Sequence, residues 1–144
     1  MVTLEFTFPG GKLKQEVTSI TLVNNVIYIH DETVPTGKLW ILLGIKFVNG
    51  DNVTRTVTIN KYKTASKALL LAKLASEIDL AANGGVRHWP NLNVTGAVRG
   101  AATKPAEFLA AGNTLEVKWA AGGASAGFVD ADGLAIEYLE IDAP

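Results

Sequence analysis

The chain has 144 residues, of which 48% are hydrophobic and 19% charged, with a formal net charge of −1 and no cysteine. A chain of this length and hydrophobicity is expected to fold as one packed domain rather than to remain disordered. Its dispersed basic residues argue against binding to nucleic acid or to a membrane surface, and the missing thiols exclude disulfides and cysteine-ligated metals. The same balance of charge gives little electrostatic protection against self-association.

The N-terminal segment is predicted to form strands. Residues 2–8 alternate between apolar and polar side chains and end at Pro9-Gly10-Gly11, a pattern typical of a half-buried strand followed by a turn. Residues 16–23 and 26–30 are rich in strand-forming side chains, and Asn24-Asn25 between them tolerates the φ angles of a tight turn. A hairpin is therefore expected at this turn.

Residues 39–48 form a strongly apolar run, which predicts a central strand covered on both faces. Strict alternation would place five of its side chains together on one face: Leu39, Ile41, Leu43, Ile45 and Phe47. Asn49-Gly50 is a strong hairpin signal and leads into residues 53–59, where apolar residues alternate with threonine. These two strands are expected to pair antiparallel.

Between residues 65 and 82 the hydrophobic period changes from 2 to 3.6, which predicts one inserted amphipathic helix. Thr64 or Ser66 is suited to cap its start, and Asn83-Gly84-Gly85 supplies its stop. A helical projection gives a core-facing stripe of Leu70, Leu71, Leu74, Ile78 and Ala81. This helix would interrupt an otherwise β-rich pattern.

The polar side of that helix would carry a second apolar stripe. Leu69 and Leu80 project within about 20° of each other on a helical wheel, and the small residues Ala72 and Ser76 lie between them. One interpretation is an interface with a second copy or a partner, and the other is that isolated exposed leucines are ordinary. These four residues are the candidate interface.

The C-terminal part predicts further strands. Residues 86–105 are turn-rich and give no firm assignment, although Pro105–Ala110 is expected to form a single helical turn. Residues 115–119 and 133–141 alternate as strands around a loop at 120–132. With no linker or repeat, residues 1–144 are predicted to form a single, mainly β domain: an antiparallel jelly roll or β-sandwich with one inserted helix.

The sequence contains no recognisable catalytic or metal-binding motif. His30 and His88 are its only histidines, and we expect neither to have a local partner at metal-ligand or triad spacing. No Gly-x-Ser-x-Gly elbow is present either. We therefore expect no catalytic residue, no metal, no cofactor and no enzymatic activity.

Tryptophans offer the other possible ligand contact. Trp89 stands beside Pro90 and close to Arg87, and it is the best candidate for an exposed ring that stacks on a sugar. Trp40 and Trp119 fall within predicted strands, where packing in the core is the simpler interpretation.

Two segments near the C-terminus resemble a known family. Residues 108–119 (FLAAGNTLEVKW) and 135–141 (AIEYLEI), joined by a loop of glycine, alanine and serine, resemble small jelly-roll virion proteins of tailed bacteriophages. The rest of the chain shares only their general pattern. The resemblance implies a structural virion protein, above all a capsid decoration (cement) protein, often a trimer, that clamps adjacent major capsid subunits.

The first functional hypothesis is thus a decoration protein that acts by binding. It would be made in the host cytoplasm and reside on the capsid surface, with further copies of itself and the major capsid protein as partners. In agreement with synthesis in the cytoplasm, the N-terminus lacks a signal-peptide layout, and no apolar run approaches the ~18 residues of a membrane span. The second hypothesis is a carbohydrate- or receptor-binding β-sandwich module of a tail fibre or secreted protein. A metal-independent enzyme is the third.

Overall fold

The computed structural model describes the chain except residues 1, 22–25, 51–52, 91, 93–106 and 121–128, and it leaves out the side chains of residues 21 and 129–132. Its elements are β1 (Val2–Phe8), β2 (Gly11–Thr21), β3 (Tyr28–Thr33), β4 (Lys38–Asn49), β5 (Arg55–Tyr62), β6 (Leu70–Leu80), β7 (Gly85–Trp89), β8 (Glu107–Leu109), β9 (Thr114–Trp119) and β10 (Val129–Asp142). In the described part of the chain, no helix has the length and apolar character needed to cross a membrane.

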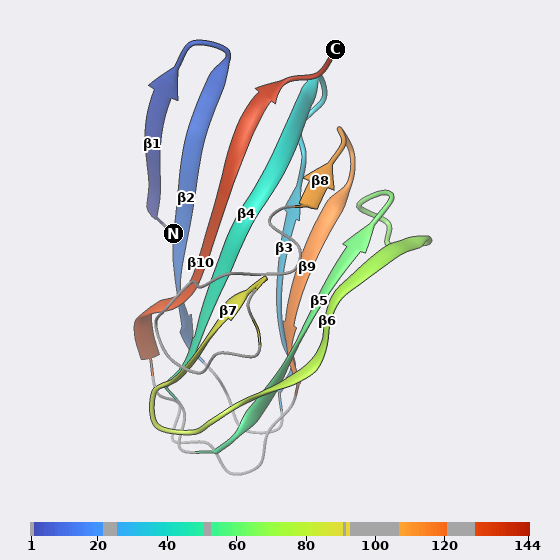
Figure 1. Ribbon diagram of the computed structural model, residues 1–144. Helices are drawn as coiled ribbons and strands as arrows, with labels where there is room; N and C mark the ends of the chain where they lie inside the picture. The colour runs from blue at the N-terminus through green and yellow to red at the C-terminus, as the bar shows by residue number, and fades with distance from the viewer. Residues whose placement is uncertain (1, 22–25, 51–52, 91, 93–106, 121–128) are drawn as a thin grey trace.

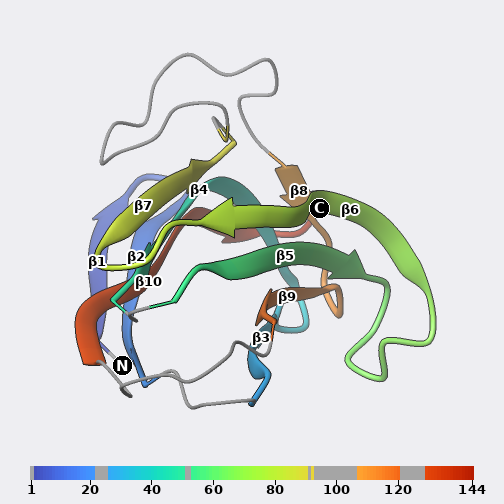
Figure 2. The ribbon, with the colours of Figure 1, turned by 90° about the horizontal axis from the view of Figure 1, so that it is seen from below.

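The strands form two antiparallel sheets that face each other as a β-sandwich (Figure 1). The six-stranded sheet has the order β1-β2-β10-β4-β7, and β8 pairs with β4 beside β7. The four-stranded sheet has the order β3-β9-β5-β6. At one end, β6 passes through a short turn into β7 and so connects the two sheets (Figure 2). The predicted antiparallel β-sandwich is confirmed.

The hydrophobic core lies between the sheets. Phe47 of β4 meets Trp119 of β9 edge to face, with ring centroids 6.4 Å apart. Trp40 of β4 stacks on Tyr138 of β10 at a centroid distance of 4.1 Å. All four rings are buried. These contacts identify the inward face of each strand, and strand alternation then assigns the remaining side chains to the inner or the outer face.

A β-bulge in β4 makes the predicted face of this strand wrong. Tyr138 of β10 pairs with Leu42, whereas the preceding residue Glu137 pairs with Gly44, so β4 carries one extra residue at this point. The bulge reverses the alternation, as an inserted residue must. Leu39 and Ile41 therefore point outward, while Ile45 and Phe47 are fully buried on the inner face. Strict alternation had placed all four together.

The inserted helix predicted at 65–82 is also wrong. Residues 63–69 form turns and residues 70–80 form β6, which pairs antiparallel with β5. On β5 every second residue points inward, as in a regular strand. The β6 residues that pair with them are spaced unevenly: Ala72, Ala75, Ile78 and Leu80. Two register shifts thus create a three-residue spacing that resembles the period of a helix.

Both predicted hairpins are wrong for a common reason. The chain crosses from one sheet to the other between β2 and β3, and again between β4 and β5. Neighbours in sequence therefore lie in opposite sheets instead of pairing. The Asn24-Asn25 turn itself lies outside the described residues. The tight turn at Pro9-Gly10-Gly11 instead joins a true hairpin, β1–β2, whose register runs from Val2–Val17 to Phe8–Gly11.

The C-terminal predictions have mixed outcomes. The strand expected at 115–119 is confirmed as β9, and the one at 133–141 lies within β10. Residues 107–109 form β8, so the helical turn predicted at Pro105–Ala110 is wrong for these residues, and Pro105 lies outside the described chain. The segment without an assignment, residues 86–105, begins inside β7, which spans residues 85–89.

Candidate functional site

The four residues of the candidate interface do not share an exposed stripe. Leu80 is 0% exposed and belongs to the core, whereas Leu69 is 51% exposed in the turn before β6. Ala72 points inward at half burial, and Ser76 is exposed. The grouping required helical geometry, and a strand with register shifts distributes these residues differently. The exposed apolar residues here are instead consecutive: Leu69, Leu70 and Leu71.

Trp89 is not an exposed stacking platform. Its side chain is only 3% exposed and belongs to the core cluster, opposite Ile45 on β4. Trp40 and Trp119 are buried as well. Arg87, half-buried on β7, donates a hydrogen bond to the carbonyl oxygen of Leu92. The aromatic rings on which the carbohydrate-binding hypothesis depended are therefore not exposed for stacking on a sugar.

The outer face of the six-stranded sheet carries many apolar side chains. On β1, Val2, Leu4 and Phe6 are 60%, 56% and 66% exposed. Strand pairing continues this face across the sheet through half-buried aliphatic residues and the exposed Phe108: Leu13, Val17, Leu139, Ile141, Leu39, Ile41 and Phe108. We call these residues, with those of β1, the outer apolar face. A shallow depression on this face is lined by apolar and polar side chains in equal number: Leu4, Phe6, Leu13, Glu5, Gln15 and Glu137.

The inner side of the β1–β2 hairpin is polar. Lys14 lies 3.1 Å from Glu140 and 3.5 Å from Glu5, and Lys12 also pairs with Glu5. Glu140 in addition accepts a 2.8 Å hydrogen bond from the indole nitrogen of Trp40. The hairpin thus directs its charged residues toward its own sandwich and its apolar residues away from it. This is the reverse of what burial against its own core would favour.

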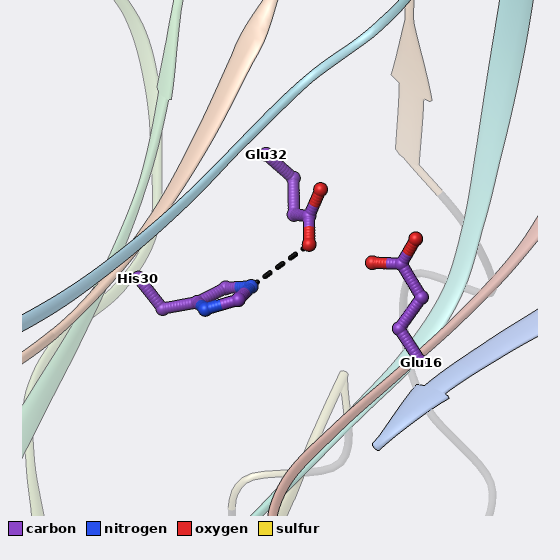
Figure 3. Close-up of side chains that lie close together, drawn as sticks. All are labelled: Glu16, His30 and Glu32. Carbon is purple, nitrogen blue, oxygen red and sulfur yellow. Dashed lines mark hydrogen bonds and ion pairs between the residues drawn. The ribbon is translucent and has the colours of Figure 1, made fainter. Parts of the chain in front are cut away.

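A second cluster combines one histidine and two glutamates. Glu16 on β2 belongs to the six-stranded sheet, and His30 and Glu32 on β3 belong to the four-stranded sheet. All three side chains point into the space between the sheets and toward one another (Figure 3). Nε2 of His30 lies 2.9 Å from Oε1 of Glu32, and one ligand atom from each residue lies within 4.8 Å of the others.

The core holds Glu16 in place. The hydroxyl group of Tyr138 donates a 2.8 Å hydrogen bond to Oε1 of Glu16, and the Tyr138 ring is itself fixed by stacking on Trp40. Oε2 of Glu16 is buried and has no hydrogen-bond partner among the described residues. Glu16 as a whole is 9% exposed, so this oxygen has lost its water without gaining a replacement.

The electrostatics of the cluster separate the two carboxyl groups. Burial, together with the interaction with Glu32, raises the pKa of Glu16 to about 7. Burial alone would raise the pKa of Glu32 as well, but the hydrogen bond to His30 and the proximity of Glu16 outweigh it and lower this pKa. Burial and the bond to Glu16 raise the pKa of Tyr138, which keeps this hydroxyl group a donor.

The expectation that His30 has no local partner is wrong. Two residues apart on a strand, His30 and Glu32 share a face, and this spacing was visible in the sequence. Glu16 was not detectable in this way because it comes from the opposite sheet. The second histidine, His88, points outward on β7 beside Lys46 of β4, far in register from this cluster.

Chemically, an imidazole nitrogen and two carboxylates can hold either a shared proton or a divalent cation. The outer apolar face, in contrast, supports only binding. No protein-family model, curated protein or solved structure matches the chain, so these two sites rest on the residues and their geometry.

Proposed function

We propose that this protein is a structural protein of a tailed-phage virion, a capsid decoration protein, which assembles through the outer apolar face. The observation that carries the proposal is the orientation of the β1–β2 hairpin. Its exposed apolar residues Val2, Leu4 and Phe6 point away from the core that the chain forms by itself. Burying each such side chain contributes about 1.5–3 kcal/mol, so a free outer apolar face favours association.

The occupant of this face is a second copy of the chain. The outward charged residues on the face, Lys46 and Glu137, have opposite signs, so no strongly charged partner is required. Two identical apolar faces are complementary to each other, and a net charge of −1 offers little repulsion. Among the described strands β1 also forms an edge of its sheet, where a further strand can add.

The fold supports a jelly roll as the finer description of the sandwich. Leaving aside β1 and β8, eight strands remain, and they pair first with last: β2 with β10, β3 with β9, β4 with β7, and β5 with β6. Pairing of this nested kind, with crossings between two sheets, is what a rolled antiparallel double sheet requires. Small jelly-roll virion proteins are the group that residues 108–119 and 135–141 resemble.

Assembly is tested by light scattering on the purified protein with two matched variants. Phe6 and Thr7 are adjacent exposed residues on opposite faces of β1. The wild type is expected to be an oligomer: pairing of two identical faces gives a dimer, whereas the resemblance implies a trimer. In either case Phe6→Lys should weaken association at least tenfold. Thr7→Lys should leave it unchanged. A monomeric wild type, or a Phe6→Lys variant that associates like the wild type, would contradict the proposal.

The virion role needs a separate measurement. Capsid shells of the source phage that lack this protein should co-sediment with it, whereas unassembled capsid subunits should not. If the protein binds the assembled lattice and not free subunits, it stabilises the shell by linkage. Shells that carry the protein should then dissociate at a higher temperature than bare shells. If the protein forms an oligomer but does not co-sediment with the shells, the virion role is contradicted while self-association stands.

A further inference from the structure

We propose that Glu16, His30 and Glu32 form a binding site for one divalent transition-metal ion, with Zn²⁺ as the best-matched ion. The inference is independent of the assembly proposal because the site lies between the sheets and the outer apolar face lies outside them. Neutral imidazole and carboxylates are ordinary ligands of zinc, and the cluster offers one imidazole and two carboxyl groups. Cysteine, which softer metals prefer, is absent from the chain.

The geometry is close to that of a metal site. Two ligands bonded tetrahedrally to one ion at about 2.0–2.2 Å lie roughly 3.3–3.6 Å apart. Nε2 of His30 and Oε1 of Glu32 are 2.9 Å apart, joined by a hydrogen bond, and the three residues offer ligand atoms within 4.8 Å of one another. Binding therefore requires the His30–Glu32 pair to open slightly as the ion replaces the shared proton, and the Glu16 carboxyl group to move toward the pair on β3 (Figure 3).

A second and independent observation points to a ligand. Glu16 is 9% exposed, its carboxyl group is directed into the cluster, and its Oε2 is buried without a hydrogen-bond partner among the described residues. Buried polar atoms are nearly always paired, and leaving one without a partner is destabilising. A cation at the centre of the cluster would use this oxygen.

The surroundings resemble the outer shell of a metal site. Tyr138 orients Glu16 by a 2.8 Å hydrogen bond. Lys14, the nearest described lysine on the same face of β2, forms ion pairs with Glu140 and Glu5 instead of with Glu16. The side chains of His30 and Glu32 retain 15% and 17% exposure, which gives an ion a path inward. Three protein ligands leave at least one coordination position open. By joining β2 to β3, the ion would tie the two sheets together.

Zinc titration of chelator-treated protein by calorimetry tests the site. The wild type should bind one Zn²⁺ per chain and gain thermal stability. Glu16→Gln and His30→Gln should each weaken binding at least tenfold and abolish the gain in melting temperature. His88→Gln is the matched control, since it removes the only other histidine, and it should bind like the wild type.

Imidazole NMR resonances provide a readout that does not depend on stability. Zinc should shift the signals of one histidine only, and these signals should be missing in folded His30→Gln. The proposal is overturned if the wild type binds no zinc. It is equally overturned if all variants bind alike, which would mean an adventitious ion only, or if zinc shifts only the signals of His88.

Discussion

The hydroxyl group of Tyr138 on β10 lies 2.8 Å from Oε1 of Glu16 on β2, and this hydrogen bond joins the aromatic core to the polar cluster at the edge of the sandwich. Tyr138 stacks on Trp40 on one side and donates to a buried carboxyl group at the other. The bond therefore holds Glu16 in position and favours its carboxylate form, whereas burial and the neighbouring Glu32 raise the pKa of Glu16. The first two predictions concern these opposing effects.

Tyr138→Phe should destabilise the metal-free protein by about 1–3 kcal/mol, because it leaves Oε1 of Glu16 buried without its donor while the ring remains. Urea unfolding followed by tryptophan fluorescence would measure the loss. Tyr28→Phe is the control: the ring of Tyr28 packs edge-on against Trp119 at 5.7 Å, and phenylalanine preserves this contact. Equal losses in the two variants would contradict the role of the hydrogen bond.

The metal-free protein should become less stable as the pH rises from 5 to 8. The pKa of Glu16 is about 7 in the folded state and 4.5 in its ordinary state, so the folded chain binds the extra proton between these values. Stability from this group is present below pH 4.5 and is lost as the pH rises through 7. The groups facing Glu16 are His30, Glu32 and Tyr138, and the lowered pKa of Glu32 acts only at more acidic pH.

Glu16→Gln should flatten that dependence, since the amide does not titrate. The measurement is the free energy of unfolding at several pH values in the presence of a chelator, with an expected wild-type change on the order of 2 kcal/mol. The pH dependence that remains in Glu16→Gln reports on other groups. If the wild-type curve were flat, or rose with pH over this range, the assigned pKa of Glu16 would be wrong.

The strand content of this fold was largely visible in the sequence, because period-2 alternation marks β1 and β9 directly. What alternation does not show is an extra residue. The bulge between Leu42 and Gly44 reverses the faces of β4, and the register shifts in β6 space its inward residues three apart. Alanine, leucine and lysine, all good helix formers, completed the resemblance to a helix, and pairing with β5 overrode that local preference.

Partnership between strands was predicted less well than the strands themselves. A turn signal such as Asn49-Gly50 reports that the chain bends, but not whether it returns to the same sheet or crosses to the opposite one. The same limit applies to the polar cluster. His30 and Glu32 share a face by simple spacing, whereas Glu16 reaches them only because β2 and β3 lie in opposite sheets.

Leu80→Lys should unfold the protein rather than dissociate an oligomer. Leu80 is 0% exposed, so lysine would replace a core side chain by a buried charge, at an expected cost of about 4 kcal/mol or more. Leu69→Lys, at a 51% exposed position, should change stability by less than about 0.5 kcal/mol. Circular dichroism during thermal unfolding distinguishes the two, and a stably folded Leu80→Lys variant would contradict the assigned inward face of β6.

Gly11→Ala tests how closely the β1–β2 hairpin packs against β10. A Cβ atom at this position would lie 2.7 Å from the carbonyl oxygen of Glu140 and 2.8 Å from Cγ2 of Ile141, and 3.4 Å from the ring of Phe8. Backbone does not yield as a flexible side chain does, so β2 and β10 would have to separate at an expected cost of about 1–3 kcal/mol. Thr7→Ala, an exposed substitution in the same hairpin, should cost much less. Since the added methyl group would displace Ile141, which belongs to the outer apolar face, Gly11→Ala should also weaken oligomer formation, and light scattering on the folded variant would show it. Unchanged stability and unchanged association together would mean that the hairpin packs less closely on β10 than its register requires.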